Sequence, residues 1–187
     1  HDLRTLSQDS IGRHVSMVLQ EPFLFSGTIF ENIRYASVTK NAVDVERAAQ
    51  AVGAHDFIAR LPGDYQFVLD QGGGNLSLGQ RQLISFARAL VADTRILVLD
   101  EATANVDSYS ERKIQRALKI LLEGRTAIVI AHRLATIRDC DRILVLNHGR
   151  LVEEGSHQEL MDIDGLYARL CRLNYASFDD VPSSAIR

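Results

Sequence analysis

The chain has 187 residues, of which 46% are hydrophobic and 24% charged, a composition typical of a folded globular protein with one sizeable core. Its 21 basic and 24 acidic residues leave a formal net charge of −3, so there is no electrostatic case for nucleic acid or an anionic membrane surface as a partner. No apolar run approaches the roughly 20 residues of a membrane-spanning helix. Cys140 and Cys171 lack CxxC spacing, which favours a reducing compartment and a role as small core residues.

The first third of the chain predicts a buried strand followed by a helical lobe. The strand covers residues 15–19 and stops before Pro22, because proline removes a backbone donor and disfavours helix in the residue before it. Gln20 is therefore expected at a strand end. Residues 28–61 carry apolar side chains at helical spacing until Pro62 and Gly63 break the pattern.

A second helix is predicted after the glycines at residues 72–74, which we expect to form a flexible loop. It begins near Ser77, and its buried face repeats every three and four residues. The residues on that face are Leu83, Phe86, Ala87, Leu90 and Val91. The loop offers a hydroxyl, backbone N–H groups and the positive end of the helix dipole to an anion. Taken alone, however, Ser77 is more simply explained as the helix N-cap.

From residue 95 onward the pattern changes to short, almost uninterrupted apolar runs, typical of strands covered on both faces of a parallel sheet. The runs at residues 96–99 and 127–130 are separated by a helix, for which Ser108 and Glu111 have the spacing of a capping box. Strand, helix and strand in this order predict an α/β layer whose ligands bind at the carboxyl ends of the strands.

The C-terminal part predicts a hairpin and a further helix. Apolar residues 143–146 and 151–152 flank a turn sequence at 147–150, and we expect this hairpin to add an edge to the sheet. Ser156 and Glu159 have the spacing of a second capping box.

Polar residues follow the predicted strands. Asp100 and Glu101 end a buried strand, which is costly unless a cation or a reaction uses the carboxylates, although a strand ending on solvated acidic residues is common. His132 follows the next strand, where a lone histidine is usually an ordinary surface residue. Because Gln20 also ends a strand, we expect Gln20, Asp100 and His132 to converge at one edge of the sheet.

Taken together, these segments resemble the ATP-binding domain of ABC transporters. Residues 97–101 are similar to the second nucleotide motif of P-loop ATPases. Residues 76–80, Leu-Ser-Leu-Gly-Gln, resemble the family signature LSGGQ, with Leu78 in place of the first glycine. Residues 26–33 resemble the exporter branch, in which membrane and ATPase domains share one polypeptide. The resemblance implies an ATP-hydrolysing motor domain that drives substrate efflux with ATP and Mg²⁺ as cofactors.

The resemblance also implies roles for the residues at the strand ends. Glu101 would polarise the water that attacks the γ-phosphate, and His132 would contact that phosphate. Asp100 and Gln20 would hold Mg²⁺, and Gln20 would also take part in nucleotide binding.

A second set of residues is implied to face a partner ATPase domain, identical or not, arranged head to tail. Ser77, Gly79 and Gln80 would bind the nucleotide held by that partner. Asp107 would connect the two active sites, although it could equally be only a helix cap.

The fold implied is the P-loop, RecA-like core of an ABC ATPase, with a mostly parallel sheet, a helical subdomain and the N-terminal part missing. The core would comprise residues 1–20 and 93–174, the helical subdomain residues 21–92, and a flexible tail residues 175–187.

One family element is missing from the sequence. The chain contains no G-x-x-x-x-G-K-[ST] loop, and none of its three lysines, Lys40, Lys113 and Lys119, follows a glycine. We therefore expect a fragment, inactive by itself, of a protein held at the cytoplasmic face of the plasma (inner) membrane by a transmembrane domain of the same polypeptide.

A non-catalytic or regulatory ABC subunit and a soluble importer ATPase subunit remain alternatives. An ABC-type ATPase acting on DNA ranks lower, because no heptad repeats lie between Gln20 and Asp100.

Overall fold

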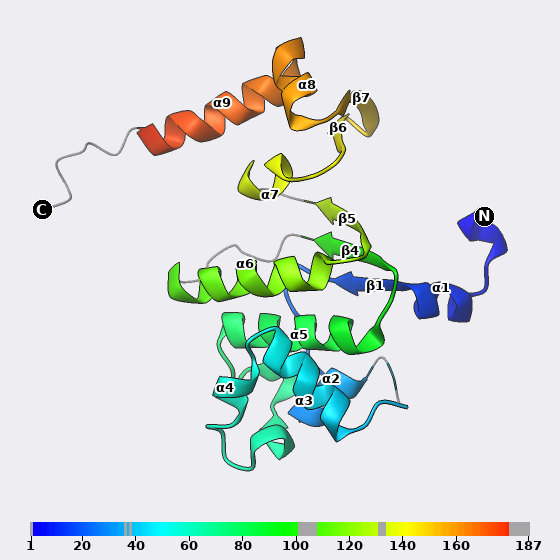
Figure 1. Cartoon of the computed structure of the whole chain (residues 1–187), viewed down its shortest axis with the longest axis vertical. Helices are drawn as coiled ribbons and strands as arrows, with labels where there is room; N and C mark the ends of the chain where they lie inside the picture. The colour runs from blue at the N-terminus through cyan, green and yellow to red at the C-terminus, as the bar shows by residue number, and fades with distance from the viewer. Residues whose placement is uncertain (1, 36, 38, 101–107, 131–133, 180–187) are drawn as a thin grey trace, which may run out of the picture. The chain divides into compact units, whose positions relative to one another are not determined.

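The computed structural model describes residues 2–35, 37, 39–100, 108–130 and 134–179, which belong to two compact units, His1–Ile130 and Ala131–Arg187. Figure 1 shows the helices and strands in chain order. The first unit contains a parallel sheet and a helical lobe, and the second contains a hairpin and three helices. The class is therefore α/β, as the sequence predicted.

The first unit is built on a three-stranded parallel sheet with the strand order β1-β4-β5. Its strands are β1 (Val15–Val18), β4 (Ile96–Asp100) and β5 (Thr126–Ile130). Val18 is in register with Leu99, and Asp100 with Ile130, so the strands end nearly level. This confirms the predicted strands and their parallel arrangement.

Two long helices, α5 (Leu78–Ala92) and α6 (Ser108–Leu122), pack against each other, and α5 also contacts β1 (Figure 1). Leu97 and Leu99 are buried on one face of the sheet, as alternation along a strand requires. Met17, Ile128 and Ile130 on the other face are more than half exposed. The described residues therefore cover only one face, whereas the apolar runs predicted that both would be covered.

The helical lobe follows the sequence prediction for residues 28–61. It consists of α2 (Ile29–Arg34), α3 (Ala42–Ala51) and α4 (His55–Ile58). A short antiparallel pair, β2 (Gly27–Thr28) and β3 (Val68–Leu69), closes it. Because α2 and α3 both contact α5, the lobe and the sheet form one compact unit. The proposed subdomain boundaries within that unit stay a prediction.

The start of the chain and the connections of the lobe contain short helices. Before β1 lie the 3-10 turn η1 (Leu3–Thr5) and α1 (Gln8–His14), where the sequence predicted only a connector. Between the lobe and α5 lie the 3-10 turns η2 (Asp64–Gln66) and η3 (Gln71–Gly73).

The second unit begins with α7 (Leu134–Arg138) and contains the predicted hairpin. Strands β6 (Ile143–Asn147) and β7 (Arg150–Gly155) pair antiparallel around His148 and Gly149, whose φ angles are 48° and 76°. Positive φ at both central residues is typical of two-residue hairpin turns. The hairpin strands pair with each other as a two-stranded sheet, and the expected place of the hairpin at an edge of the parallel sheet stays a prediction.

The helices of the second unit are α8 (His157–Ile163) and α9 (Leu166–Asp179). The capping box of Ser156 and Glu159 at the start of α8 is confirmed. Cys171 is buried in the small core of this unit, as expected. Helix α9 extends to Asp179, and the flexible tail expected over residues 175–187 stays a prediction. Helix α6 begins at Ser108, directly after residues outside the described ranges, so the capping box of Ser108 and Glu111 also stays a prediction.

Candidate functional site

The carboxyl ends of β1 and β4 place two of the candidate residues at the same edge of the sheet. Asp100 is the last residue of β4 and is partly exposed, while Gln20 follows β1 by two residues and is exposed. Because Val18 pairs with Leu99 in a parallel register, both polar side chains belong to the edge where open α/β sheets bind ligands. Carboxylate and amide oxygens there suit a hard cation such as Mg²⁺.

Three candidate residues lie outside the described residues: Glu101, Asp107 and His132. Their chain neighbours are described. Glu101 directly follows the end of β4, Asp107 directly precedes α6, and β5 ends two residues before His132. The roles of these three residues therefore stay predictions.

The loop before α5 has a defined geometry at Ser77. The Ser77 hydroxyl accepts a hydrogen bond from the Gln80 amide at 3.3 Å, and the Gln80 side chain accepts one from the Ser77 amide at 2.9 Å. This capping box confirms that α5 begins immediately after Ser77. Ser77 is exposed and Gly79 is buried, so the hydroxyl reaches the surface at the positive end of a 15-residue helix.

Sequence reasoning missed the residues that support this loop. Arg81 donates from Nη1 to the carbonyl oxygens of Leu76, at 2.8 Å, and Gly73, at 3.4 Å. Asn75 accepts from the Asp70 amide at 3.3 Å and donates to the carbonyl oxygen of Val68 at 3.0 Å. The expected flexible loop is therefore tied by side chains to its own neighbours. The only signal for this in the sequence was the presence of polar residues around the glycines.

Gln82 is a further residue of α5, to which the sequence analysis assigned no role. Its side chain is completely buried, and neither its Nε2 nor its Oε1 has a hydrogen-bond partner within the described part of the chain. An unsatisfied buried amide costs about 1–3 kcal/mol. The side-chain amide of Gln82 therefore needs hydrogen-bond partners that the described residues do not provide.

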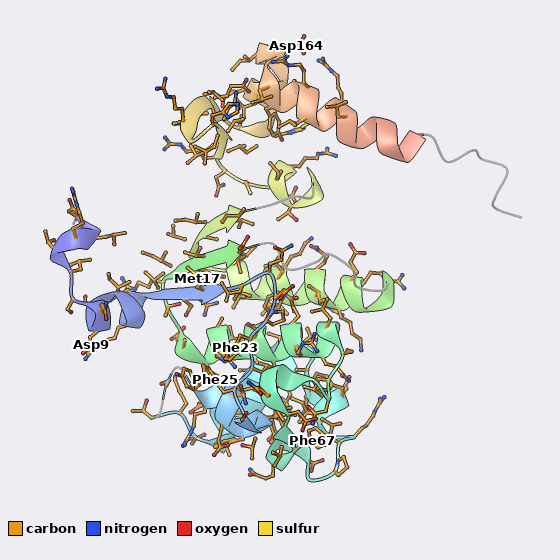
Figure 2. All side chains as sticks on the ribbon, turned by 180° about the vertical axis from the view of Figure 1, so that it is seen from behind. Asp9, Met17, Phe23, Phe25, Phe67 and Asp164 are labelled. Carbon is orange, nitrogen blue, oxygen red and sulfur yellow. The ribbon has the colours of Figure 1, made fainter. Side chains whose placement is uncertain are left out.

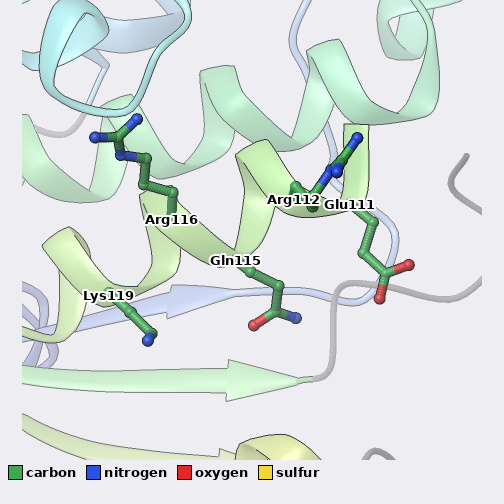
Figure 3. Close-up of a pocket in the computed structure, with 5 residues that line it drawn as sticks. All are labelled: Glu111, Arg112, Gln115, Arg116 and Lys119. Carbon is green, nitrogen blue, oxygen red and sulfur yellow. The ribbon is translucent and has the colours of Figure 1, made fainter. Parts of the chain in front are cut away.

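A depression on the surface of α6 lies apart from these residues. Its described lining consists of Glu111, Arg112, Gln115, Arg116 and Lys119, all on one helix, and Figure 3 shows Arg112 and Arg116 pointing to the same side. Neither Asp100 nor Ser77 is among its lining residues. We therefore do not assign the nucleotide to it.

Within the described ranges, no group of three or more His, Cys, Asp or Glu side chains is placed to hold a metal ion. None of the helices in that part of the chain is long and apolar enough to span a membrane.

Comparison with known proteins defines the class. Residues 1–104 match the family described as ABC transporter, and the chain belongs to that family. It is 53% identical to an uncharacterized ABC transporter ATP-binding protein, YknV of Bacillus subtilis, over 94% of this chain and 29% of that protein. It is 47% identical to an ATP-dependent lipid A-core flippase of Desulfotalea psychrophila, over 90% of this chain and 30% of that one.

A solved structure of a bacterial Atm1-family ABC exporter with ATP bound is similar in fold, with a TM-score of 0.84 and 40% identity. The match covers 93% of this chain and 30% of that one. The predicted fold class, the P-loop core of an ABC ATPase, is therefore confirmed. The chain spans about three-tenths of the length of these relatives.

Proposed function

We propose that this chain is the distal part of the ATP-hydrolysing motor domain of an ABC exporter. The observation that carries the proposal is the parallel register of β1 and β4, which puts the strand end leading to Gln20 beside Asp100. Ser77 adds an exposed hydroxyl at the start of α5. Several relatives are named as exporters, among them a leptomycin B resistance protein of Schizosaccharomyces pombe that is 48% identical over 90% of this chain.

ATP would supply the phosphoryl group, and Mg²⁺ would neutralise the negative charge of that group. In this proposal Asp100 and Gln20 offer oxygen ligands to the cation, Glu101 orients and polarises the attacking water, and His132 contacts the γ-phosphate. The position of Asp100 at the last residue of β4 fits the role, because its carboxylate leaves the buried strand where the sheet meets solvent.

The Ser77 loop is proposed to act on a nucleotide held by a second ABC ATPase domain. Ser77, Gly79 and Gln80 would close over the phosphates, with the helix dipole of α5 favouring negative charge. Asp107 would link the two active sites. Each site then needs two chains, identical or different, and ATP-driven closure would move a transmembrane domain of the same polypeptide at the cytoplasmic face of the membrane.

The test compares Glu101→Gln with the control Glu123→Gln in the longer polypeptide that carries this chain together with a phosphate-binding loop. Glu123 is exposed, follows α6 and has no described role. We expect Glu101→Gln to retain MgATP binding while turnover falls at least about tenfold, a loss of about 1.4 kcal/mol of transition-state stabilisation.

Glu123→Gln should retain full turnover in the same assay. Unchanged turnover in Glu101→Gln would remove Glu101 from its role. The absence of any ATPase activity in the unsubstituted polypeptide would favour a regulatory subunit instead.

A further inference from the structure

Arg88 lies on α5 and binds a segment far away in the sequence. Its Nε donates to the carbonyl oxygen of Asn32 at 2.9 Å, its Nη2 to Oδ1 of Asn32 at 2.8 Å, and its Nη1 to the carbonyl oxygen of Phe23 at 3.0 Å. These partners are 56 and 65 residues away along the chain. All three guanidinium nitrogens are engaged, which only the planar fork of arginine can achieve.

Asn32 extends this network into the segment that follows β1. Its Oδ1 also accepts from the Phe25 amide at 2.9 Å, and its Nδ2 donates to the carbonyl oxygens of Phe25, at 2.9 Å, and Thr28, at 3.0 Å. Asn32 is 2% exposed, so these bonds are shielded from water. We refer to Arg88, Asn32, Phe23 and Phe25 as the Arg88 junction.

Aromatic rings complete the surroundings of the guanidinium. The Phe25 ring stacks on Tyr35 with centroids 4.2 Å apart, and the Arg88 Cζ lies 5.4 Å from the Phe25 centroid and 5.9 Å from that of Tyr35. Figure 2 shows Phe23 and Phe25 beside α5, between the sheet and the helical lobe. Burial lowers the pKa of Arg88, and its described hydrogen-bond partners are neutral oxygens. Among the described residues, the junction is therefore held by hydrogen bonds from the guanidinium to neutral oxygens and not by an ion pair with a carboxylate.

The junction connects a segment proposed to serve this chain's own nucleotide with a helix proposed to serve the nucleotide of the partner domain. Phe23 and Phe25 belong to the irregular segment between β1 and β2, which begins at the strand end that leads to Gln20. Arg88 belongs to the helix that Ser77 caps. Because a helix is stiff over its length, a bond from Arg88 to Phe23 sets where the Gln20 segment lies relative to the Ser77 loop.

We propose that Arg88 is a positioning residue, which fixes the Gln20 segment to the signature helix α5 so that Gln20 and Ser77 move as one body. The inference rests on the proposed function, because that function assigns Gln20 to this chain's own nucleotide and Ser77 to the nucleotide of the partner domain. A positioning role differs from a purely stabilising role in one respect. Loss of the three hydrogen bonds donated by the Arg88 guanidinium should displace Gln20 even in a protein that remains folded.

The first experiment measures amide hydrogen exchange on this chain with Arg88→Lys and the matched control Arg47→Lys. Arg47 is exposed on α3 and is not part of the junction. Lysine keeps the charge but cannot reach three acceptors, so we expect exchange in residues 23–25 to rise at least about fivefold in Arg88→Lys and to stay within about twofold in Arg47→Lys. Unchanged exchange at residues 23–25 in folded Arg88→Lys, as judged by circular dichroism, would overturn the proposal.

The second experiment measures turnover of the longer polypeptide in a double-mutant cycle. We expect Arg88→Lys to lower kcat about fivefold, and Gln20→Ala with Arg88→Lys to be no slower than Gln20→Ala alone, because both changes remove the same positioned group. Effects that multiply would contradict a positioning role.

A third variant controls for stability. Val45→Ala removes part of a fully buried side chain on α3 and destabilises the same lobe away from the junction. If Val45→Ala lowers kcat as much as Arg88→Lys at an equal loss of Tm, Arg88 is merely structural. If the unsubstituted polypeptide hydrolyses no ATP, the proposed function fails, while the exchange measurement still decides whether Arg88 holds the segment.

Discussion

Ser77 and Gln80 each accept a hydrogen bond from the other's backbone amide, the first at its hydroxyl and the second at its side-chain carbonyl. In this arrangement the Ser77 oxygen serves as an acceptor, and the hydroxyl proton remains available to a ligand. The role as N-cap and the proposed role as phosphate contact are therefore compatible. A single residue can start α5 and present a donor at its positive end.

The first prediction separates these two roles of Ser77. Ser77→Ala should lower the free energy of unfolding of the chain by about 1 kcal/mol, because the Gln80 amide loses its acceptor. Ser77→Asp should keep the stability, since aspartate is an equally good N-cap, but should repel phosphate. Urea unfolding gives the stability, and ATP turnover of the longer polypeptide gives the function. Equal stability of the alanine and serine forms would contradict the capping role.

The second prediction concerns two adjacent glycines in the loop before α5. Gly73 is buried with φ at 72°, and an added Cβ would lie 2.9 Å from Leu24 Cδ1 and 3.0 Å from Arg81 Cδ. Gly74 has φ at −59° and would place its Cβ no closer than 3.8 Å to the carbonyl oxygen of Gln71.

Gly73→Ala should therefore cost about 2 kcal/mol or more, from left-handed backbone strain together with the close contact. Gly74→Ala is the matched control and should change the free energy of unfolding by less than about 0.5 kcal/mol. Thermal unfolding of the two variants provides the comparison. Similar losses in both would mean that Gly73 is not held as described.

The third prediction is a pH dependence that arises at the start of α2. Hydrogen bonds donated by the backbone amide and the hydroxyl of Thr28 hold the pKa of Glu31 below its ordinary value of 4.5. Because folding lowers this pKa, the stabilisation is present above pH 4.5 and is lost as the pH falls through the lowered value.

Glu31→Gln should therefore flatten the decline in unfolding free energy on acidification below about pH 5, because glutamine does not titrate. Glu123→Gln, on an exposed residue outside the capping box, serves as the control and should keep the wild-type slope. Urea midpoints measured at several pH values would reveal the difference. Identical slopes for Glu31→Gln and the parent chain would contradict the capping geometry.

The fourth prediction concerns nucleotide binding by this chain alone. Its sequence contains no glycine-rich loop ending in Gly-Lys, so the backbone amides and lysine that neutralise phosphates in such loops are not supplied. Calorimetric titration with MgATP should therefore show no micromolar binding, and ATPase activity should be negligible. A micromolar Kd would show that the residues described here suffice for binding.

Local patterns predicted many of the elements because their causes are local. The apolar runs that became β1, β4 and β5, the spacing that became α5 and the capping box at Ser156 each depend on a few neighbouring residues. Expectations that depend on residues far away along the chain were less successful. The apolar runs predicted a sheet covered on both faces, whereas Met17, Ile128 and Ile130 are more than half exposed, because the pattern of a strand does not specify which other elements pack on it.

The sequence by itself determined the family, the strand ends that carry Gln20 and Asp100, and the cap at Ser77. These features depend on the order of motifs and on hydrogen bonds between residues that are close together in the sequence. Only the tertiary structure decided the strand order β1-β4-β5, the burial of Gly73 and the bonds of Arg88 to Asn32 and Phe23. The physical reason is chain separation: a guanidinium and its acceptors 56 and 65 residues away meet only after the sheet and the helical lobe have packed around α5.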